Sequence, residues 1–361
     1  MWIKEEISKL HRTREVETDR TGMFRMDRNE RTIPFEESFM GAVKDKLSSE
    51  ILTNYPNENG LYDKLVAYLG HGLSTDNLIM HTGSDLVIKS IFETYIEKND
   101  RVLLHKPSYA MYEVYSNMFG AELCAVEYND NLEFDLQQYT GTIKSYKPKL
   151  AILENPNGFI GNFYNEAEVR KFVEACMSIE AIAIVDEAYI DFCNESIIGE
   201  INNYDNLIIV RTFSKAWGLA GLRVGYALAN NSIIRDLDKS RPMHQFTGFS
   251  ALVCELLLNY DQHVNEYINQ MKMSREYTIN EFKRLKIPFV YGETNFITAK
   301  IGAVLELDEF RKICKDEHFL LRRPFREEKF KEWLRIGLLD IDNMKRFIYL
   351  VEKCKRGGEF F

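Results

Sequence analysis

Residues 211–226 read Arg-Thr-Phe-Ser-Lys-Ala-Trp-Gly-Leu-Ala-Gly-Leu-Arg-Val-Gly-Tyr and place Lys215 shortly after an apolar run. Two hydroxyl side chains precede this lysine, and Arg223 follows it by eight residues. Taken alone, Lys215 is equally well explained as a solvated lysine on a loop. A sheltered lysine amine can form an imine with an aldehyde, while hydroxyls and a guanidinium can bind a phosphate dianion. The combination therefore indicates a cofactor site.

Short apolar runs alternate with helical patterns on the amino-terminal side of this segment and through it. The runs predict seven strands, at residues 78–81, 101–104, 123–126, 150–153, 181–185, 207–210 and 224–228. This alternation predicts an α/β fold with a large, mostly parallel seven-stranded sheet. Asn165 and Glu168 predict a capping box, and Ser84 is the expected N-cap of another helix. Polar residues thus gather where strands end, which is where open α/β sheets bind ligands.

The pattern changes after about residue 245 to long amphipathic helices and a few short strands. These strands are expected at residues 289–291, 296–299 and 334–336. We therefore expect a large cofactor-binding domain over residues 46–245 and a smaller α+β domain formed by residues 1–45 and 246–361. The charge-rich amino terminus predicts an amphipathic helical arm within the smaller domain.

The composition excludes several classes of function. The 361 residues carry 46 basic and 55 acidic side chains, with both signs interspersed, so nucleic acid is not an expected partner. The chain has no apolar run of membrane-spanning length, and its charged amino terminus does not resemble a secretory signal. Six scattered cysteines without a C-x-x-C pair predict reduced thiols in a cytoplasmic protein and no metal site.

The lysine segment resembles the S-x-K…G-L-R-x-G signature of class I and II aminotransferases, and especially the histidinol-phosphate aminotransferase group. The resemblance implies an enzyme of fold type I that depends on pyridoxal 5′-phosphate (PLP). It also implies that Lys215 holds the cofactor as a Schiff base and that Thr212, Ser214 and Arg223 bind the cofactor phosphate.

The segment Asp186-Glu-Ala-Tyr189 follows a predicted strand. An aspartate at such a place is by itself most simply a helix or turn cap. The segment matches the family's D-E-A-Y motif, which implies that Asp186 pairs with the protonated pyridine nitrogen and that Tyr189 bonds the phenolic oxygen. An ionised carboxylate beside the nitrogen keeps the ring cationic, so that the ring can accept electrons during catalysis.

Two further segments match cofactor-binding motifs of the family. Gly83, Ser84 and Asp85 match a loop whose backbone N–H groups, at the start of a helix, bind the cofactor phosphate. Tyr109 matches a tyrosine that stacks on the pyridine ring. Tyr112, three residues later, is expected to be a core residue.

The expected contacts with the substrate and with a second subunit also rest on the resemblance. Arg335 matches the arginine that clamps the substrate α-carboxylate, for which a bidentate guanidinium is suited. Arg322, with Arg323 as the alternative, matches an arginine that faces the substrate, although a solvated arginine explains Arg322 equally well. Asn29 lies in the segment that matches the family's N-E-N-P and is expected at the substrate. Tyr55 matches a tyrosine that reaches the phosphate of the neighbouring subunit, which implies a homodimer with shared active sites.

One loop departs from the family pattern. The family's N-P-N-N-P-T-G is replaced by Asn155-Pro-Asn-Gly-Phe-Ile-Gly161. By spacing, Gly158 takes the place of the asparagine whose amide donates to the phenolic oxygen, and Asn157 is the alternative donor if the loop shifts. Smaller departures follow Asn29 and Arg335. Because these changes flank the expected substrate pocket, the substrate of the family's namesake is not assumed.

These motifs predict an aminotransferase that takes an amino group from a donor, by resemblance glutamate, and passes it to a carbonyl compound. By analogy the acceptor is small and phosphorylated. A decarboxylase of a phosphorylated amino acid is the alternative, because motif spacing does not show which bond to the α-carbon breaks. A transcription regulator on this fold needs a DNA-binding domain that the short amino terminus is not expected to hold. A nicotinamide dehydrogenase needs a G-x-G-x-x-G motif, which follows no predicted strand.

Overall fold

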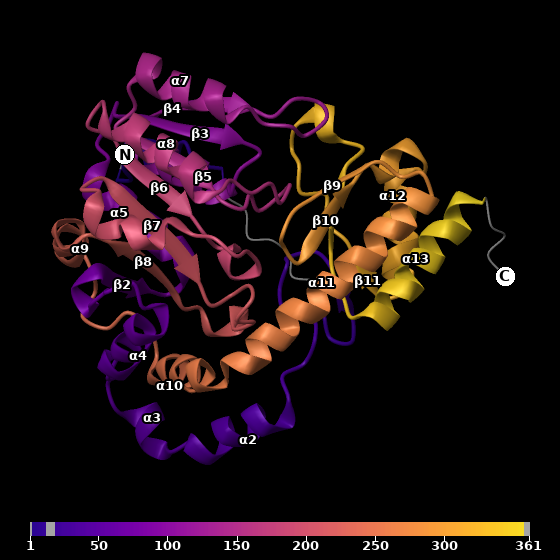
Figure 1. Cartoon of the computed structure of the whole chain (residues 1–361), viewed down its shortest axis with the longest axis horizontal. Coiled ribbons are helices and arrows are strands. Elements are labelled where there is room, and N and C mark those ends of the chain that lie inside the picture. Colours follow the sequence, from indigo (N-terminus) through magenta and orange to yellow (C-terminus); the bar gives the residue numbers. More distant parts are fainter. Residues whose placement is uncertain (1, 12–18, 357–361) are drawn as a thin grey trace.

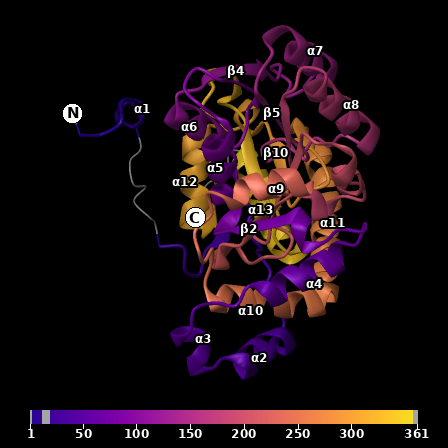
Figure 2. The same cartoon turned by 90° about the vertical axis from the view of Figure 1, so that its left-hand side faces the viewer.

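The computed structural model describes residues 2–11 and 19–356, so the predicted amino-terminal arm lies partly outside the described residues. The described part of the arm contains one short helix, α1 (Glu5–Ser8), which contacts α6 (Ala110–Phe119). An ion pair of 2.7 Å between Glu6 and Lys98 holds α1 there. Figure 2 shows this segment at the periphery of the molecule.

A seven-stranded sheet forms the centre of the larger unit, as predicted (Figure 1). The strands follow the order β2-β8-β7-β6-β5-β3-β4, and β8 is antiparallel to both of its neighbours while the other pairs are parallel. Their bounds are β2 (Leu78–His81), β3 (Arg101–Lys106), β4 (Glu122–Glu127), β5 (Leu150–Glu154), β6 (Ile182–Asp186), β7 (Leu207–Thr212) and β8 (Gly225–Ala229). Several strands run one or two residues further at their carboxyl ends than predicted, which brings their polar end residues into the sheet.

Both faces of the sheet are covered by helices, because successive side chains of each strand point to opposite faces. On one face, side chains such as Val102, Ile152 and Ile208 pack against α5 (Gly83–Tyr95), α6 and α9 (Asn231–Asp238). On the other face, Leu103, Leu153 and Ile209 pack with α7 (Leu136–Tyr146) and α8 (Glu166–Met177). The buried strands read as near-continuous apolar runs for this reason.

The sequence predicted the N-terminal caps of two helices, α8 and α5. The capping box of α8 is confirmed, since Asn165 and Glu168 each accept a hydrogen bond from the other's backbone N–H. The prediction that Ser84 is the N-cap of α5 is wrong. The helix begins at Gly83, with Thr82 as its N-cap, and Gly83 adopts the left-handed φ of +80°. Ser84 therefore lies in the first turn, where its backbone N–H needs no partner within the helix.

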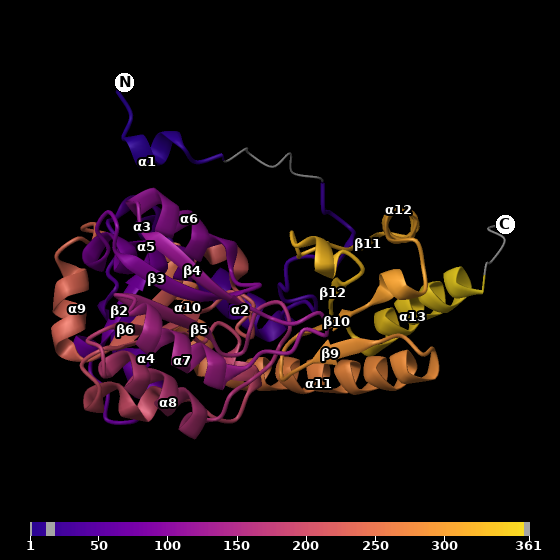
Figure 3. The ribbon, with the colours of Figure 1, turned by 90° about the horizontal axis from the view of Figure 1, so that it is seen from above.

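The smaller α+β unit lies at one end of the large sheet (Figures 1 and 3). It has an antiparallel sheet in the order β12-β10-β9 and a parallel pair of β1 with β11. Its strands are β1 (Phe24–Arg25), β9 (Phe289–Tyr291), β10 (Phe296–Ala299), β11 (Phe319–Leu320) and β12 (Leu334–Gly337), and its helices are α11 (Asp261–Arg284), α12 (Leu307–Asp316) and α13 (Ile341–Lys355). The helix α11 runs from the larger unit along the whole smaller one (Figure 3).

Four more helices complete the fold beside the large sheet: α2 (Glu37–Lys46), α3 (Ser49–Thr53), α4 (Asn59–Leu69) and α10 (Gly248–Leu257). The helix α10 packs on α2, α3 and α4. The chain therefore remains beside the larger unit for some residues after residue 245, before it enters the smaller one. Within the described residues, no helix combines the length and the apolar character that crossing a membrane requires.

Candidate active site

The predicted cofactor residues meet at the carboxyl edge of the large sheet. Asp186 ends β6 and Thr212 ends β7, and Glu154, which was not among the predicted residues, ends the neighbouring strand β5. At the same edge, α5 begins at Gly83, and Tyr109 is the N-cap of α6. The parallel strands bring these positions together because their carboxyl ends point the same way.

Lys215 lies in the loop that follows β7. Its Nζ donates a hydrogen bond of 3.1 Å to the backbone carbonyl of Arg28 and lies 5.3 Å from the ring centre of Tyr189. The amine is therefore held between the amino-terminal segment and the D-E-A-Y segment. The sequence identified Lys215 and Tyr189, while the carbonyl of Arg28 was missed because a backbone acceptor leaves no mark on the sequence.

Asp186 is a buried carboxylate with two hydrogen-bond donors. Its Oδ2 accepts from the hydroxyl of Tyr112 at 2.7 Å, and its Oδ1 accepts from the backbone N–H of Ala188 at 3.1 Å. Burial raises the pKa of Asp186 to about 6, and the two donors and the nearby Lys215 oppose that rise. A protonated ring nitrogen beside this carboxylate would favour its charged form further. Tyr112 was predicted as core; it is fully buried, and its hydroxyl also positions Asp186.

Backbone and side-chain donors converge at the start of α5. A Cβ on Gly83 would lie 2.5 Å from Nη2 of Arg223, and a Cβ on Gly225 would lie 2.0 Å from the backbone nitrogen of Ser84. Glycine at both positions thus allows β8 and Arg223 to approach the first turn of the helix. The hydroxyl of Ser214 is buried without a hydrogen-bond partner among the described residues. Groups of this kind suit a phosphate, and their roles toward the cofactor phosphate stay predictions.

Two other predicted phosphate ligands have partners within the protein. Thr212 Oγ1 accepts from the backbone N–H of Ser214 at 3.1 Å, so it shapes the loop that leads to Lys215. Asp85 Oδ1 accepts from the hydroxyl of Tyr115 at 2.9 Å. Their roles toward the cofactor stay predictions.

These residues fit PLP. The donors at the start of α5 match its phosphate, the carboxylate of Asp186 matches its ring nitrogen, and the amine of Lys215 lies beside Tyr189, where the aldehyde end is expected. When bound, the cofactor supplies an electron-accepting ring that stabilises negative charge on the substrate α-carbon. The partly exposed ring of Tyr109 approaches Tyr112 edge-on, with 6.2 Å between the ring centres. Its stacking on the pyridine ring stays a prediction.

Asn157 and Gly158 are the two positions of the departing loop that could replace the family's asparagine. Asn157 is fully buried, its Nδ2 donates to the carbonyl of Pro107 at 3.1 Å, and its Oδ1 accepts from the backbone N–H groups of Phe159 and Ile160. The amide therefore holds its own loop, which speaks against Asn157 as the donor to the phenolic oxygen. A Cβ on Gly158 would lie 3.3 Å from Cε2 of Tyr189, so position 158 borders the tyrosine that is expected at the phenolic oxygen.

Asn29 lies at the centre of this site. Its Nδ2 donates a hydrogen bond of 2.9 Å to the hydroxyl oxygen of Tyr189, and its backbone carbonyl accepts from Nδ2 of Asn295. Asn29 also has a left-handed φ of +55°, which asparagine tolerates better than most residues. The sequence placed Asn29 at the substrate, and its observed amide contact is with Tyr189.

Arg335 on the small sheet is paired through its backbone with Arg322. Arg335 is largely buried, and its Nη1 and Nη2 donate to the carbonyls of Gly158 at 2.8 Å and Asp27 at 3.1 Å. An isolated antiparallel bridge pairs it with Arg322, so both side chains leave the same face. Burial, together with the charge of Arg322, lowers the pKa of Arg335. Arg323 instead pairs with Asp308 at 3.4 Å, which favours Arg322 of the two alternatives.

Tyr55 lies on the surface of the chain. The residue is 84% exposed, and its ring stacks on His244 with 4.7 Å between the ring centres. Exposure leaves it accessible to a second subunit, and its contact across an interface stays a prediction.

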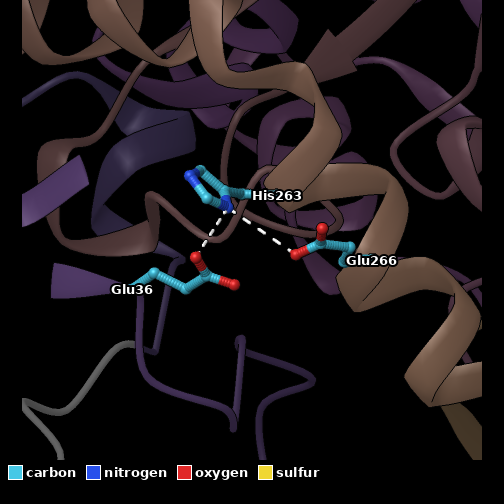
Figure 4. A group of neighbouring side chains, drawn as sticks. All are labelled: Glu36, His263 and Glu266. Carbon is cyan, nitrogen blue, oxygen red and sulfur yellow. Dashed lines mark ion pairs between the residues drawn. The ribbon is translucent and has the colours of Figure 1, made fainter. Parts of the chain in front are cut away.

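A separate cluster of chargeable groups joins α2 to α11 (Figure 4). Nδ1 of the buried His263 lies 3.4 Å from Glu36 and 3.7 Å from Glu266, and both carboxylates are exposed. None of these residues was predicted to be functional. The closeness of these groups links the start of α11 to the segment that precedes α2.

The comparisons with known proteins agree with this geometry. The family described as aminotransferase class I and II matches residues 27–350. A histidinol-phosphate aminotransferase from Caldanaerobacter subterraneus subsp. tengcongensis is 32% identical over 280 residues, covering 77% of this chain and 78% of the relative. One from Rippkaea orientalis is 24% identical and covers 93% of each chain. These relatives are aminotransferases, and no comparison favours the decarboxylase alternative.

Solved structures share the fold. The crystal structure of histidinol-phosphate aminotransferase from Sinorhizobium meliloti in complex with pyridoxal-5′-phosphate superposes with a TM-score of 0.87 at 20% identity, covering 99% of this chain and 98% of that one. Aspartate aminotransferase from Thermus thermophilus with maleate gives a TM-score of 0.78 at 14% identity, covering 92% and 91%. With the lysine, the carboxylate and the donors at the start of α5 in place, the chain belongs to the class I and II aminotransferases and is a PLP-dependent enzyme of fold type I.

Proposed function

We propose that this enzyme moves an amino group between glutamate and a small carbonyl compound that carries a phosphate, of the histidinol-phosphate type. The observation that carries the proposal is the pair of Arg335 and Arg322 on one face of the small sheet. Two adjacent guanidinium groups repel one another, and a dianion between them relieves this repulsion. A carboxylate of the donor and a phosphate of the acceptor suit the same two cations in turn. The names of the relatives support this substrate class.

The residues of the chain divide the work of transamination. With PLP bound, Lys215 would take up the proton of the substrate α-carbon and later give it back, acting as base and then as acid. The carbonyl of Arg28 gives its amine a resting position at 3.1 Å. Asp186 keeps the ring nitrogen protonated, and Tyr112 holds Asp186 in place at 2.7 Å. Arg335 orients the substrate so that the C–H bond faces Lys215.

We also propose that the active unit is a homodimer in the cytoplasm, with Tyr55 reaching the cofactor phosphate of the other subunit. Support comes from large apolar side chains that the single chain exposes on and near α2 and α3. A soluble chain that leaves such side chains in water has a surface suited to burial against a copy of itself. These side chains are Met40, Leu47, Leu52, Tyr55 and Met243.

The substrate is tested by two half-reactions. The PLP form of the enzyme is mixed with glutamate, and the pyridoxamine form is mixed with a panel of carbonyl compounds that includes matched pairs with and without phosphate. Conversion of the cofactor is followed by absorbance, and products are identified by mass. We expect the phosphorylated member of a pair to react at least about tenfold faster at limiting concentration, since a charged hydrogen-bonded contact is worth about 1.5–3 kcal/mol. Equal rates within every pair would contradict a phosphorylated acceptor, and release of carbon dioxide would contradict transamination.

A further inference from the structure

The backbone at position 158 runs close to Tyr189, since a Cβ built on Gly158 would lie 3.3 Å from Cε2 of that ring. A Cβ built on Gly158 would lie 3.9 Å from the hydroxyl oxygen of Tyr189 and 3.5 Å from Oε2 of Glu154. A side chain at 158 would thus begin between these two oxygens. The carboxyl group of Glu154 borders the position from which the family's asparagine reaches the phenolic oxygen of the cofactor.

Glu154 points toward the site because of its place in the sheet. It is the last residue of β5 and lies in register with Asp186, the last residue of β6. Residues in register on neighbouring strands direct their side chains to the same face. Asp186 is the expected partner of the ring nitrogen, so Glu154 is the next carboxyl group along the same edge. It is only 4% exposed, and no salt bridge forms on it within the described residues.

We propose that Glu154 takes over the role of the missing asparagine and donates a hydrogen bond from its carboxyl group to the phenolic oxygen of PLP. The proposal concerns cofactor binding and is independent of the substrate proposed above.

The hydrogen bonds around Glu154 favour a donor. Its Oε1 accepts from the backbone N–H of Tyr109 at 2.5 Å, and its Oε2 accepts from the backbone N–H of Gly158 at 3.1 Å. Each carboxyl oxygen thus accepts from one backbone N–H. A proton on the carboxyl group of Glu154 is then free to be donated to a further acceptor. These two bonds also fix the direction of the carboxyl plane without any cation.

The state of protonation agrees with this role. Burial, assisted by the negative charge of Asp186, raises the pKa of Glu154 to about 8, against the two N–H donors and Arg335. Glu154 therefore keeps its proton at neutral pH and can donate. The ionisable or charged groups around it lie on several elements. They are Asp186 on β6, Tyr109 and Tyr112 at the start of α6, Tyr189 after β6, His105 on β3, Tyr128 after β4, Tyr139 on α7 and Arg335 on β12.

The hydroxyl of Tyr189 can be the second donor to the phenolic oxygen, because of its contact with Asn29. Because its amide donates to the oxygen of Tyr189 at 2.9 Å, the proton of that hydroxyl is available for another acceptor. The phenolic oxygen would then receive two O–H donors, from Tyr189 and Glu154, where the family uses a tyrosine and an asparagine.

The first test is a spectrophotometric pH titration of the bound cofactor. Donors to the phenolic oxygen stabilise its negative charge and lower the pKa of the bound cofactor. We expect Glu154→Leu to raise that pKa by about one to two pH units, the equivalent of one charged hydrogen bond. Glu154→Gln keeps an N–H donor and should shift it less, and Gly158→Asn added to Glu154→Leu should bring it back toward the wild-type value. The control is Glu122→Leu, which makes the same change at the first residue of β4, at the end of the sheet away from the site.

The second test needs no cofactor. Difference infrared spectra of the apoprotein should contain the carbonyl stretch of a protonated carboxylic acid at neutral pH, and Glu154→Gln should remove it. A titration of this band should have its midpoint near pH 8. An ionised Glu154 at pH 6.5 to 7 would overturn the proposal, as would a cofactor pKa that is the same in the wild type, Glu154→Leu and Glu154→Gln. If Glu154→Leu fails to fold, Glu154→Gln and the infrared band decide the question.

Discussion

Asn29 and Tyr189 are joined by a hydrogen bond of 2.9 Å from the amide Nδ2 to the hydroxyl oxygen, across 160 positions of the sequence. The contact couples the amino-terminal segment of the smaller unit to the cofactor-binding edge of the large sheet. It gives a residue expected at the substrate a second task, that of orienting a tyrosine hydroxyl.

This contact predicts that Asn29 acts through Tyr189. Removing one neutral hydrogen bond costs about 0.5–1.5 kcal/mol, so Asn29→Ala should raise the pKa of the bound cofactor by up to about one pH unit. In Asn29→Ala combined with Tyr189→Phe, the pKa should be no higher than in Tyr189→Phe alone. The measurement is an absorbance titration of the four proteins. Additive changes would mean that Asn29 reaches the cofactor by itself.

Lys215→Ala should abolish the cofactor's imine absorbance and reduce transamination by more than about a hundredfold, because the lysine supplies both the covalent link and the moving proton. The fold should be retained, since among the described residues the amine donates a single hydrogen bond, of 3.1 Å, and it is not part of the core. Circular dichroism is the control for folding. Wild-type turnover in this variant would refute the assignment of the site.

Tyr112→Phe should move the pH dependence of cofactor affinity. The hydroxyl stabilises the ionised form of Asp186, so its removal raises the pKa of Asp186 above the present value of about 6. Protonated Asp186 cannot pair with the ring nitrogen, and the acid limb of PLP affinity should therefore shift to higher pH. Measuring Kd for PLP between pH 5 and 8 tests this, with Tyr146→Phe, which loses a bond to the carbonyl of Glu122 at the start of β4, as the control. Identical acid limbs in all three proteins would show that Tyr112 is a core residue only.

The apoprotein should lose stability as pH rises through the range set by Glu154. The usual pKa of this group is 4.5, and the folded value is about 8. Between these values the folded chain holds a proton that the unfolded chain releases, so the free energy of unfolding falls with rising pH. Glu154→Gln should remove this part of the slope. Urea unfolding of both proteins at several pH values from 4.5 to 8 measures the difference, and parallel curves would contradict the raised pKa.

Mixed dimers test the proposed role of Tyr55. Tyr55→Phe and Lys215→Ala, each poorly active alone, should regain activity on subunit exchange, because one site of the mixed dimer then carries both changes and the other carries none. Activity approaching one quarter of the wild-type value is the statistical expectation, since about half of the dimers are mixed and each has one intact site. If Tyr55→Phe is impaired and no activity returns, Tyr55 acts within its own subunit.

Local features of the chain were readable from its sequence. The strands of the large sheet were placed to within two residues because buried strands are continuous apolar runs bounded by turn residues. The segment of Lys215 and Arg223 was recognised because its spacing lies within a dozen positions. The N-cap of α5 was misplaced by two residues, because the left-handed backbone of Gly83 begins the helix earlier than the hydroxyl pattern indicates.

Contacts between distant segments depended on the tertiary structure. Tyr112 meets Asp186, Asn29 meets Tyr189, and the carboxyl group of Glu154 meets the backbone N–H of Tyr109 only once the order of the strands and the placement of the amino-terminal segment are set. The sequence names a tyrosine, an asparagine or a glutamate in the same way whether its side chain bonds to water or to another side chain. Periodicity and motif spacing report on neighbours along the chain, whereas burial, which raises the pKa of Glu154, is a property of the whole fold.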